Sequence, residues 1–252
     1  MIRNAIVYGL LILLLTGLSL NAQVTIKPHY GYWFATMDNA NNLITQSIEG
    51  PSGWRAVLGE PVPHPGQFDG NRTFGLQLEY HGNEDLFVAI QAGYFDDEVE
   101  STYANPQATP PWDFLFRRKV RLYDVMLNLH YYPNYSSWRR FNYYLGLGVG
   151  WMNLEAISVS RTDNPIRPTD SRGEYNRSIV SGSLTLGANF RLVDALKLWA
   201  EGGYQYGNFG RLDGTITTLE ITEPVETTTE TEFDLSGLFV RGGVGFSIPF
   251  LR

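Results

Sequence analysis

The chain has 252 residues, no cysteine and a formal net charge of -7, so we expect no nucleic-acid partner, no disulfide and no lipid anchor on cysteine. Its mean hydropathy of -0.18 resembles that of a water-soluble protein, although aromatic residues make up 14% of the chain. The same averages are typical of a transmembrane β-barrel, because half of each spanning strand is polar.

The first 22 residues are predicted to be a secretory signal peptide. Arg3 gives a short positive start, residues 5–20 are almost continuously apolar, and small residues precede Gln23. We expect cleavage after Ala22, which leaves residues 23–252 as a single mature domain. The alternative is an uncleaved anchor, but the apolar stretch is shorter than the about 20 residues that a spanning helix needs. No later stretch approaches that length, so no spanning helix is predicted there.

One segment of the mature chain shows the pattern of a membrane-spanning strand most clearly. Apolar side chains occupy every second position, and small or polar ones fill the gaps; the apolar set is Phe141, Tyr143, Leu145, Leu147, Val149 and Trp151. Successive side chains of a strand point to opposite faces, so the segment has one apolar face with rings at both ends. Aromatic residues gather at the two interfaces of a bilayer, which favours a strand whose apolar face contacts lipid.

Eight segments share this alternation. In chain order they are 24–37, 73–81, 86–97, 121–132, 141–153, 180–192, 196–208 and 238–250. They predict an all-β fold, a transmembrane antiparallel up-and-down β-barrel of eight strands. Pro28 and Pro249 fall within two of the segments, and because proline cannot donate to a strand ladder we expect both at the periplasmic rim.

The connections between these segments alternate in length. Short ones are predicted at 82–85, 134–140 and 193–194, and long ones at 38–72, 98–120, 154–179 and 209–237. Outer-membrane barrels place short turns in the periplasm and long loops outside the cell, and an even strand number puts both chain ends in the periplasm. The last long connection is acidic and rich in threonine. It is either a hairpin around Glu223-Pro224 that continues the last two strands, or a disordered loop.

These segments together resemble the small eight-stranded outer-membrane barrels of the OmpA, OmpX and OmpW kind. The final strand is similar to the C-terminal signal of such barrels, with an outward aromatic at Phe250, although Leu251 and Arg252 follow it. The resemblance implies a monomer in the bacterial outer membrane, inserted by the barrel assembly machinery and surrounded by lipid and lipopolysaccharide. The signal peptide also resembles those of exported Bacteroidetes proteins.

The inward faces of the predicted strands carry the candidate functional residues. A polar network is expected from Lys27, Glu79, Asp124, Arg191, Lys197, Glu201 and Arg241. Eight strands enclose a lumen that side chains can fill, and charges in such a space must pair. We expect each acid to pair with a base on the neighbouring strand, as in Lys27 with Glu79 and Glu201 with Arg241. His29, His81 and His130 also face inward; hydrogen-bonded filling is favoured over a metal site because no short ligand spacing supports one.

Three functions compete at this point. The favoured one is a plugged barrel with a structural or surface-interaction role, and the alternative is a small OmpW-like channel for small or apolar solutes. The third is an enzyme that modifies lipid A. Barrels of similar size that carry out this reaction use Ser, His and acidic residues at the outer rim. Only His64 lies on a predicted outer loop, without a partner nearby in sequence. No enzymatic activity and no cofactor are therefore expected.

Overall fold

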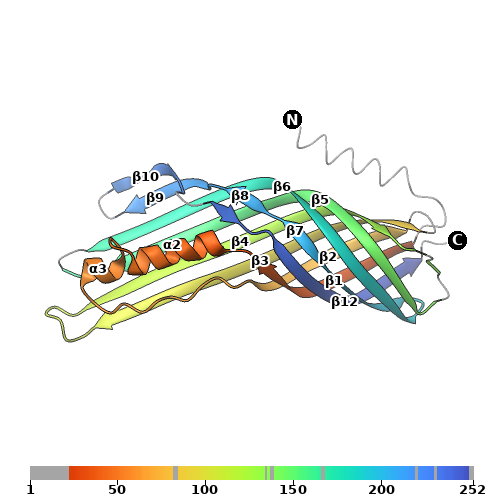
Figure 1. The fold of residues 1–252 in the computed structure, drawn as a ribbon, viewed down its shortest axis with the longest axis horizontal. Coiled ribbons are helices and arrows are strands. Elements are labelled where there is room, and N and C mark those ends of the chain that lie inside the picture. The colour runs from red at the N-terminus through yellow and green to blue at the C-terminus, as the bar shows by residue number, and fades with distance from the viewer. Residues whose placement is uncertain are drawn as a thin grey trace.

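The computed structural model describes residues 23–81, 85–133, 135–136, 139–165, 168–218, 221–229 and 232–249. The predicted signal peptide and the outward Phe250 lie outside this range. Within it, eight long strands follow one another around a ring: β1 (Gln23–Ala35), β2 (Asn71–His81), β3 (Leu86–Asn105), β4 (Trp112–Tyr131), β5 (Phe141–Thr162), β6 (Thr169–Val193), β7 (Leu196–Tyr206) and β12 (Gly237–Pro249). Each pairs antiparallel with its neighbours, and the pairing of β12 with β1 closes the ring. The predicted eight-stranded up-and-down barrel is confirmed (Figure 1).

The two ends of the barrel differ. At the end that we call the terminal end, Gln23 pairs with both Pro249 and His81. At the opposite, distal end, β3 to β6 continue far beyond the other strands as one curved sheet (Figure 1). The outward alternation predicted from the sequence holds between the two ends: Leu147 and Leu184 are 63% and 62% exposed. Outward Tyr94, Tyr123 and Trp151 lie on the neighbouring strands β3, β4 and β5 at the distal limit of this apolar band, and we call them the distal girdle.

The strands β3 to β6 are longer than the sequence predicted. The ranges 98–120 and 154–179 were expected to be loops, but the turns are confined to residues between Asn105 and Trp112 and between Thr162 and Thr169. Beyond the distal girdle the alternation reverses its polarity. Inward residues such as Phe114 are apolar and buried, whereas outward Arg117 forms ion pairs with Glu98 at 3.4 Å and Glu100 at 2.7 Å. This reversal is expected for a sheet that leaves lipid and enters water.

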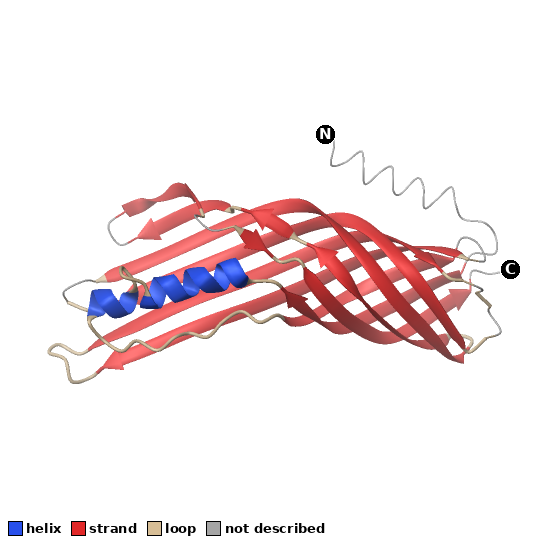
Figure 2. Cartoon of the chain, in the orientation of Figure 1, coloured by secondary structure: helices blue, strands red, loops and turns tan. Residues whose placement is uncertain are grey.

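Two helices cover the inner face of this distal sheet where a loop was predicted. They are α2 (Asp38–Glu49) and α3 (Trp54–Leu58), and Figure 2 shows α2 lying along the trough of the sheet. Ala40, Ile44 and Ile48 recur every four residues, so they share one face of α2, and all three are buried in the distal core. No helix within the described ranges is long and apolar enough to cross a membrane.

The chain between β7 and β12 forms four short strands, β8 (Asn208–Gly210), β9 (Asp213–Thr218), β10 (Ile221–Thr228) and β11 (Phe233–Asp234). β9 and β10 pair as a hairpin, which supports the hairpin interpretation over the disordered loop. The hairpin does not continue β7 and β12, because β9 pairs instead with the distal part of β6. Glu223-Pro224 lies within β10 rather than at the turn.

The expectation that Pro28 marks the rim is wrong. Pro28 lies inside β1, opposite Leu76 of β2. On its other side, the ladder to β12 pairs Ile26 with Phe246 and Tyr30 with Gly242, without pairs between them. A proline cannot donate to a ladder, which accounts for this interruption. Pro249 does lie at the terminal end, where it pairs with Gln23.

Candidate functional site

The terminal half of the lumen contains a buried ion pair between β1 and β2. Lys27 Nζ lies 2.8 Å from Glu79 Oε2, and the two side chains are 0% and 1% exposed. The register places Thr25 opposite Glu79 and Lys27 opposite Gln77, so the pair is a diagonal one across two neighbouring strands. This is one of the two pairs expected from the sequence.

The same carboxylate oxygen receives further hydrogen bonds from strand β4 and the residue that follows it. The Tyr132 hydroxyl donates to Glu79 Oε2 at 3.1 Å, and His130 Nδ1 lies 2.9 Å from it. Asn189 Nδ2 on β6 donates in turn to the Tyr132 hydroxyl at 2.7 Å. The network around Glu79 therefore spans the lumen from β1 to β6.

A second buried ion pair joins β7 and β12. Arg241 lies directly opposite Glu201 in the register, and its Nε donates to Glu201 Oε1. The hydroxyl of Tyr144 donates to Glu201 Oε2. Tyr144 crosses the lumen from β5 over Gly187, where a Cβ would collide with its ring. Both oxygens of Glu201 thus have partners, as a buried carboxylate requires.

Aromatic contacts connect the two ion pairs. The Tyr144 ring stacks on His130 with centroids 4.6 Å apart, so the partner of Glu201 touches the partner of Glu79. The Lys27 ammonium also lies 5.3 Å from the centroid of Tyr144 and 5.4 Å from that of Trp199. Cations are attracted to ring faces at such distances. The two pairs, the tyrosines, His130 and Trp199 therefore form one connected group, which we call the lumen network.

The remaining predicted residues lie at the edges of this network. Gln91 Nε2 donates to Asp124 Oδ2 at 3.4 Å, and Lys197 Nζ donates to Thr25 Oγ1 at 3.0 Å. Arg191 lies at the terminal mouth, where its Nη1 is 3.5 Å from Asp194 Oδ1. The structure thus places four of the seven predicted residues in the two pairs, two beside neutral partners and Arg191 at the mouth.

The three inward histidines occupy separate places. His130 binds Glu79, His29 packs edge-on against Trp199 at 5.9 Å, and His81 packs on Phe87 at 4.0 Å. Across the described residues, no group of three His, Cys, Asp or Glu side chains is arranged to hold a metal ion. Sequence reasoning missed Tyr132 and Tyr144 as members of the network. The available signal was that each tyrosine lies on the polar, inward face of its predicted segment.

A layer of apolar side chains occupies the distal half of the lumen, beyond the network. Trp33, Phe95, Leu122, Met152 and Phe239 come from five different strands, and all are buried. They belong to the same core as Ile44 and Ile48 of α2. The barrel interior therefore changes from a charged network near the terminal end to an apolar core beneath α2.

Comparisons with known proteins agree with this architecture. The sequence profile of the outer membrane protein beta-barrel domain family matches residues 10–231. Among proteins with curated descriptions, none matches the chain in sequence.

Two solved structures resemble the fold. The outer membrane protein OprG from Pseudomonas aeruginosa is 12% identical with a TM-score of 0.50, and the match covers 91% of this chain and 97% of that one. A major outer membrane protein from Thermus thermophilus is 10% identical with a TM-score of 0.51, covering 90% and 99%. At such identities the likeness concerns the fold alone. The closed eight-stranded ring and the match over most of the sequence together show that this chain belongs to the outer membrane protein beta-barrel domain family of the bacterial outer membrane.

Proposed function

We propose that this protein is a closed barrel that anchors a folded distal domain at the cell surface, with a structural or surface-interaction role. The observation that carries the proposal is the lumen network, whose Lys27–Glu79 pair is almost wholly removed from solvent. An ion that entered the lumen would have to separate the buried ion pairs of the lumen network and then pass the apolar layer beneath α2. Breaking a buried ion pair costs on the order of 3–5 kcal/mol, which disfavours a permanently open path.

The distal domain supplies the surface for such a role. It consists of the extended parts of β3 to β6, the hairpin β9–β10 and the helices α2 and α3 (Figure 2). Its inner face is a buried apolar core, so the domain is a packed unit rather than a set of separate loops. Its outer face carries paired charges, as in Lys119 with Asp96 and Glu98 at 3.2 Å each. Such a rigid, hydrated platform suits contact with molecules outside the cell.

The orientation in the membrane is part of the proposal. The short turns lie at the terminal end and the extended strands at the distal end, which is the asymmetry of outer-membrane barrels. The terminal end would therefore face the periplasm after removal of residues 1–22. The apolar band would contact outer-membrane lipid and lipopolysaccharide, insertion would use the barrel assembly machinery, and the barrel would act as a monomer.

We do not propose an enzyme. His64 lies in the distal domain, but its Nε2 is 3.4 Å from Thr45 Oγ1 and its Nδ1 accepts from the Gly66 amide at 3.1 Å. Neither partner is a carboxylate that could orient the ring as a general base. An unchanged lipid A mass in cells that express the protein would agree with this. A new lipid A species that disappears in His64→Ala would contradict it.

Conductance measurements test the closed barrel. The folded wild-type protein in planar bilayers should give no steady ion conductance. A variant that combines Tyr132→Ala and Tyr144→Ala in the lumen network with Phe95→Ala and Phe239→Ala in the apolar layer should open a path. Tyr143→Ala is the matched control, because this neighbouring side chain faces outward. Steady conductance or passage of small apolar solutes through the wild type would contradict the proposal and favour the channel.

A further inference from the structure

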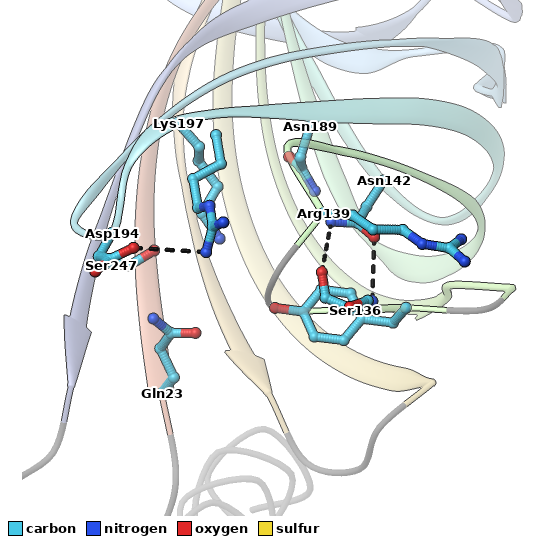
Figure 3. A pocket seen from close by; sticks show the side chains of 10 residues that line it. Gln23, Ser136, Arg139, Asn142, Asn189, Asp194, Lys197 and Ser247 are labelled. Carbon is cyan, nitrogen blue, oxygen red and sulfur yellow. Dashed lines mark hydrogen bonds and ion pairs between the residues drawn. The ribbon is translucent and has the colours of Figure 1, made fainter.

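A cavity of about 190 Å³ lies at the terminal mouth of the lumen (Figure 3). The residues that matter for its chemistry are Arg139, Asn142, Asn189, Arg191, Asp194 and Lys197. They come from the β4–β5 and β6–β7 connections, from the first residues of β5 and β7 and from the last residues of β6. The cavity adjoins the lumen network at Tyr132, to which the Asn189 amide donates and against which the ring of Tyr135, another lining residue, packs edge-on at 5.6 Å.

The cavity is positively charged although the whole chain is negative. Among the residues that the structure describes, Arg139, Arg191 and Lys197 line it together with one acid, Asp194. Asp194 is fully exposed and lies 3.5 Å from Arg191 Nη1, so water screens this pair. Lys197 donates to the neutral Thr25 hydroxyl at 3.0 Å, and the part of the chain that the structure describes offers it no carboxylate within 4.0 Å. A partly buried ammonium whose hydrogen bond goes to a neutral hydroxyl keeps further donor capacity for an anion.

The wall around the cavity is held in place by its own hydrogen bonds. Asn142 Nδ2 donates to the Ser136 carbonyl at 3.3 Å, and the Ser136 amide donates to Asn142 Oδ1 at 3.2 Å. This reciprocal pair ties the β4–β5 connection, which carries Arg139, to strand β5 (Figure 3). A site with a fixed wall loses less conformational entropy when a ligand binds.

The strand wall separates the cavity from lipid. Asn189 and Lys197 face inward, whereas Phe190 and Leu198, the next residues on the same strands, face outward and are 43% and 44% exposed. A dissolved anion can therefore reach the cavity from the aqueous side of the terminal end, whereas a lipid headgroup would have to bend around the rim. We propose that this cavity binds a small soluble anion of the phosphate or carboxylate class, held by Lys197, Arg191 and Arg139.

Calorimetric titration of the full folded barrel tests this assignment. Inorganic phosphate is added, at constant ionic strength, to barrels in phosphatidylcholine nanodiscs. We expect saturable binding that Lys197→Gln and Arg191→Gln each weaken by about tenfold, the value of one charge-assisted hydrogen bond. Arg172→Gln is the matched control, because Arg172 lies on the distal part of β6 and pairs with Glu174 at 2.6 Å. Retained heat-modifiable gel mobility verifies the folding of every variant.

Succinate, titrated in the same way, serves as the carboxylate probe. Absence of saturable binding of both phosphate and succinate to the wild type would overturn the proposal, as would equal losses in Lys197→Gln and Arg172→Gln. In a second arm, phosphatidylglycerol replaces a fraction of the phosphatidylcholine. Protection of Lys197 from acylation by this lipid, but not by dissolved phosphate, would assign the site to a lipid headgroup and reject the soluble ligand. None of these measurements depends on whether the lumen conducts ions.

Discussion

Glu79 shows at the scale of one residue how a barrel interior tolerates charge. One oxygen of its carboxylate is within hydrogen-bond distance of the Lys27 ammonium on β1, and of an imidazole and a phenol at the end of β4. The cost of removing the carboxylate from water is offset because these partners are fixed by the closed ring of strands. Lys27, the one partner of Glu79 predicted from the sequence, therefore provides only part of the stabilisation of this buried carboxylate.

The first prediction concerns this residue. Glu79→Gln leaves the Lys27 ammonium buried without its counter-charge, so we expect a loss of about 3–5 kcal/mol in the free energy of unfolding. Adding Lys27→Gln should restore part of this loss, because the two residues are coupled. Urea unfolding of the refolded barrel measures both changes.

Glu100→Gln is the control for this series. Its partner Arg117 lies on the exposed outer face of the distal sheet, where ion pairs contribute little. A Glu79→Gln barrel that is as stable as Glu100→Gln and remains non-conducting would show that the pair neither stabilises nor closes the lumen.

A second prediction at this scale concerns Asp97, which lies just beyond the distal girdle. Burial, followed by the nearby Asp69 and Asp96 charges, raises the pKa of Asp97 to about 6, although its Oδ1 accepts hydrogen bonds from Glu98 N and Asn71 Nδ2. The unfolded segment loses this proton near pH 3.9, an approximate reference value. Folded and unfolded forms are both protonated below that pH, so the carboxyl destabilises the distal domain only as pH rises toward about 6.

Asp97→Asn should therefore be more stable than the wild type at neutral pH, and the advantage should vanish near pH 4 (approximately the unfolded pKa). Tryptophan fluorescence follows the transition, because Trp33 and Trp112 belong to the distal core. An advantage of the variant that grows toward low pH would contradict the direction of this pKa shift.

At the scale of elements, the same strands pass from a lipid environment into water. Strand β5 faces lipid with Leu147 and, after Trp151, enters water with Asn153 on the same face. The inner face changes in the opposite sense, from the polar lumen to the apolar core that α2 covers. Helix α2 is thus required because the inner face of the distal sheet would otherwise expose large apolar side chains.

The third prediction tests the packing of α2. Ile44 is 0% exposed, so Ile44→Ala should weaken the docking of α2 by about 2–5 kcal/mol. Limited proteolysis of the folded protein should then cut within residues 38–49. Gln46→Ala is the control, because Gln46 lies on the exposed face of the same helix. Unchanged resistance in Ile44→Ala would indicate that α2 does not depend on the distal core.

The fourth prediction tests the boundary between lipid and water along β5. Leu147→Arg places a charge at the middle of the apolar band and should cost about 2–4 kcal/mol. Asn153→Arg on the same face, just beyond the distal girdle, should cost about 0–1 kcal/mol, because it lies near the interface. Urea unfolding in lipid vesicles compares the two, and equal losses would show that the apolar band is placed wrongly.

At the scale of the whole molecule, the two ends of the barrel differ in structure. The terminal end carries the cationic cavity, and the distal end carries the packed domain that extends the strands (Figure 1). The lumen network and the apolar layer lie between them. We therefore expect each end to meet a different aqueous compartment.

The fifth prediction tests this orientation by labelling. Because the chain contains no cysteine, a single cysteine can be introduced at Gln107, in the distal β3–β4 turn, or at Asp194, in the terminal β6–β7 turn. A membrane-impermeant maleimide should label Gln107→Cys in intact cells and Asp194→Cys only after lysis. The reverse pattern would mean that the barrel is inverted.

The alternation of residues by itself determined the barrel: the eight segments, their outward faces and the two neighbouring-strand ion pairs. Lipid on one side of a closed sheet imposes a period of two on the sequence, and adjacent strands bring residues of equal depth together. Both effects act within one strand or between neighbouring strands. The outward position of Leu147 and the pairing of Glu79 with Lys27 can therefore be predicted from the sequence.

Only the tertiary structure decided the rest. Beyond the distal girdle the apolar residues face inward instead of outward. The strand around Phe114 therefore lacks the lipid-facing pattern, and its sequence was interpreted as a loop. The asparagine-rich α2 has three buried apolar positions, and its stability comes from the sheet beneath it. Likewise, Tyr132 reaches Glu79 and Tyr144 reaches Glu201 across the lumen, between strands that are not neighbours in the sheet. Such contacts leave no periodic signal in the sequence.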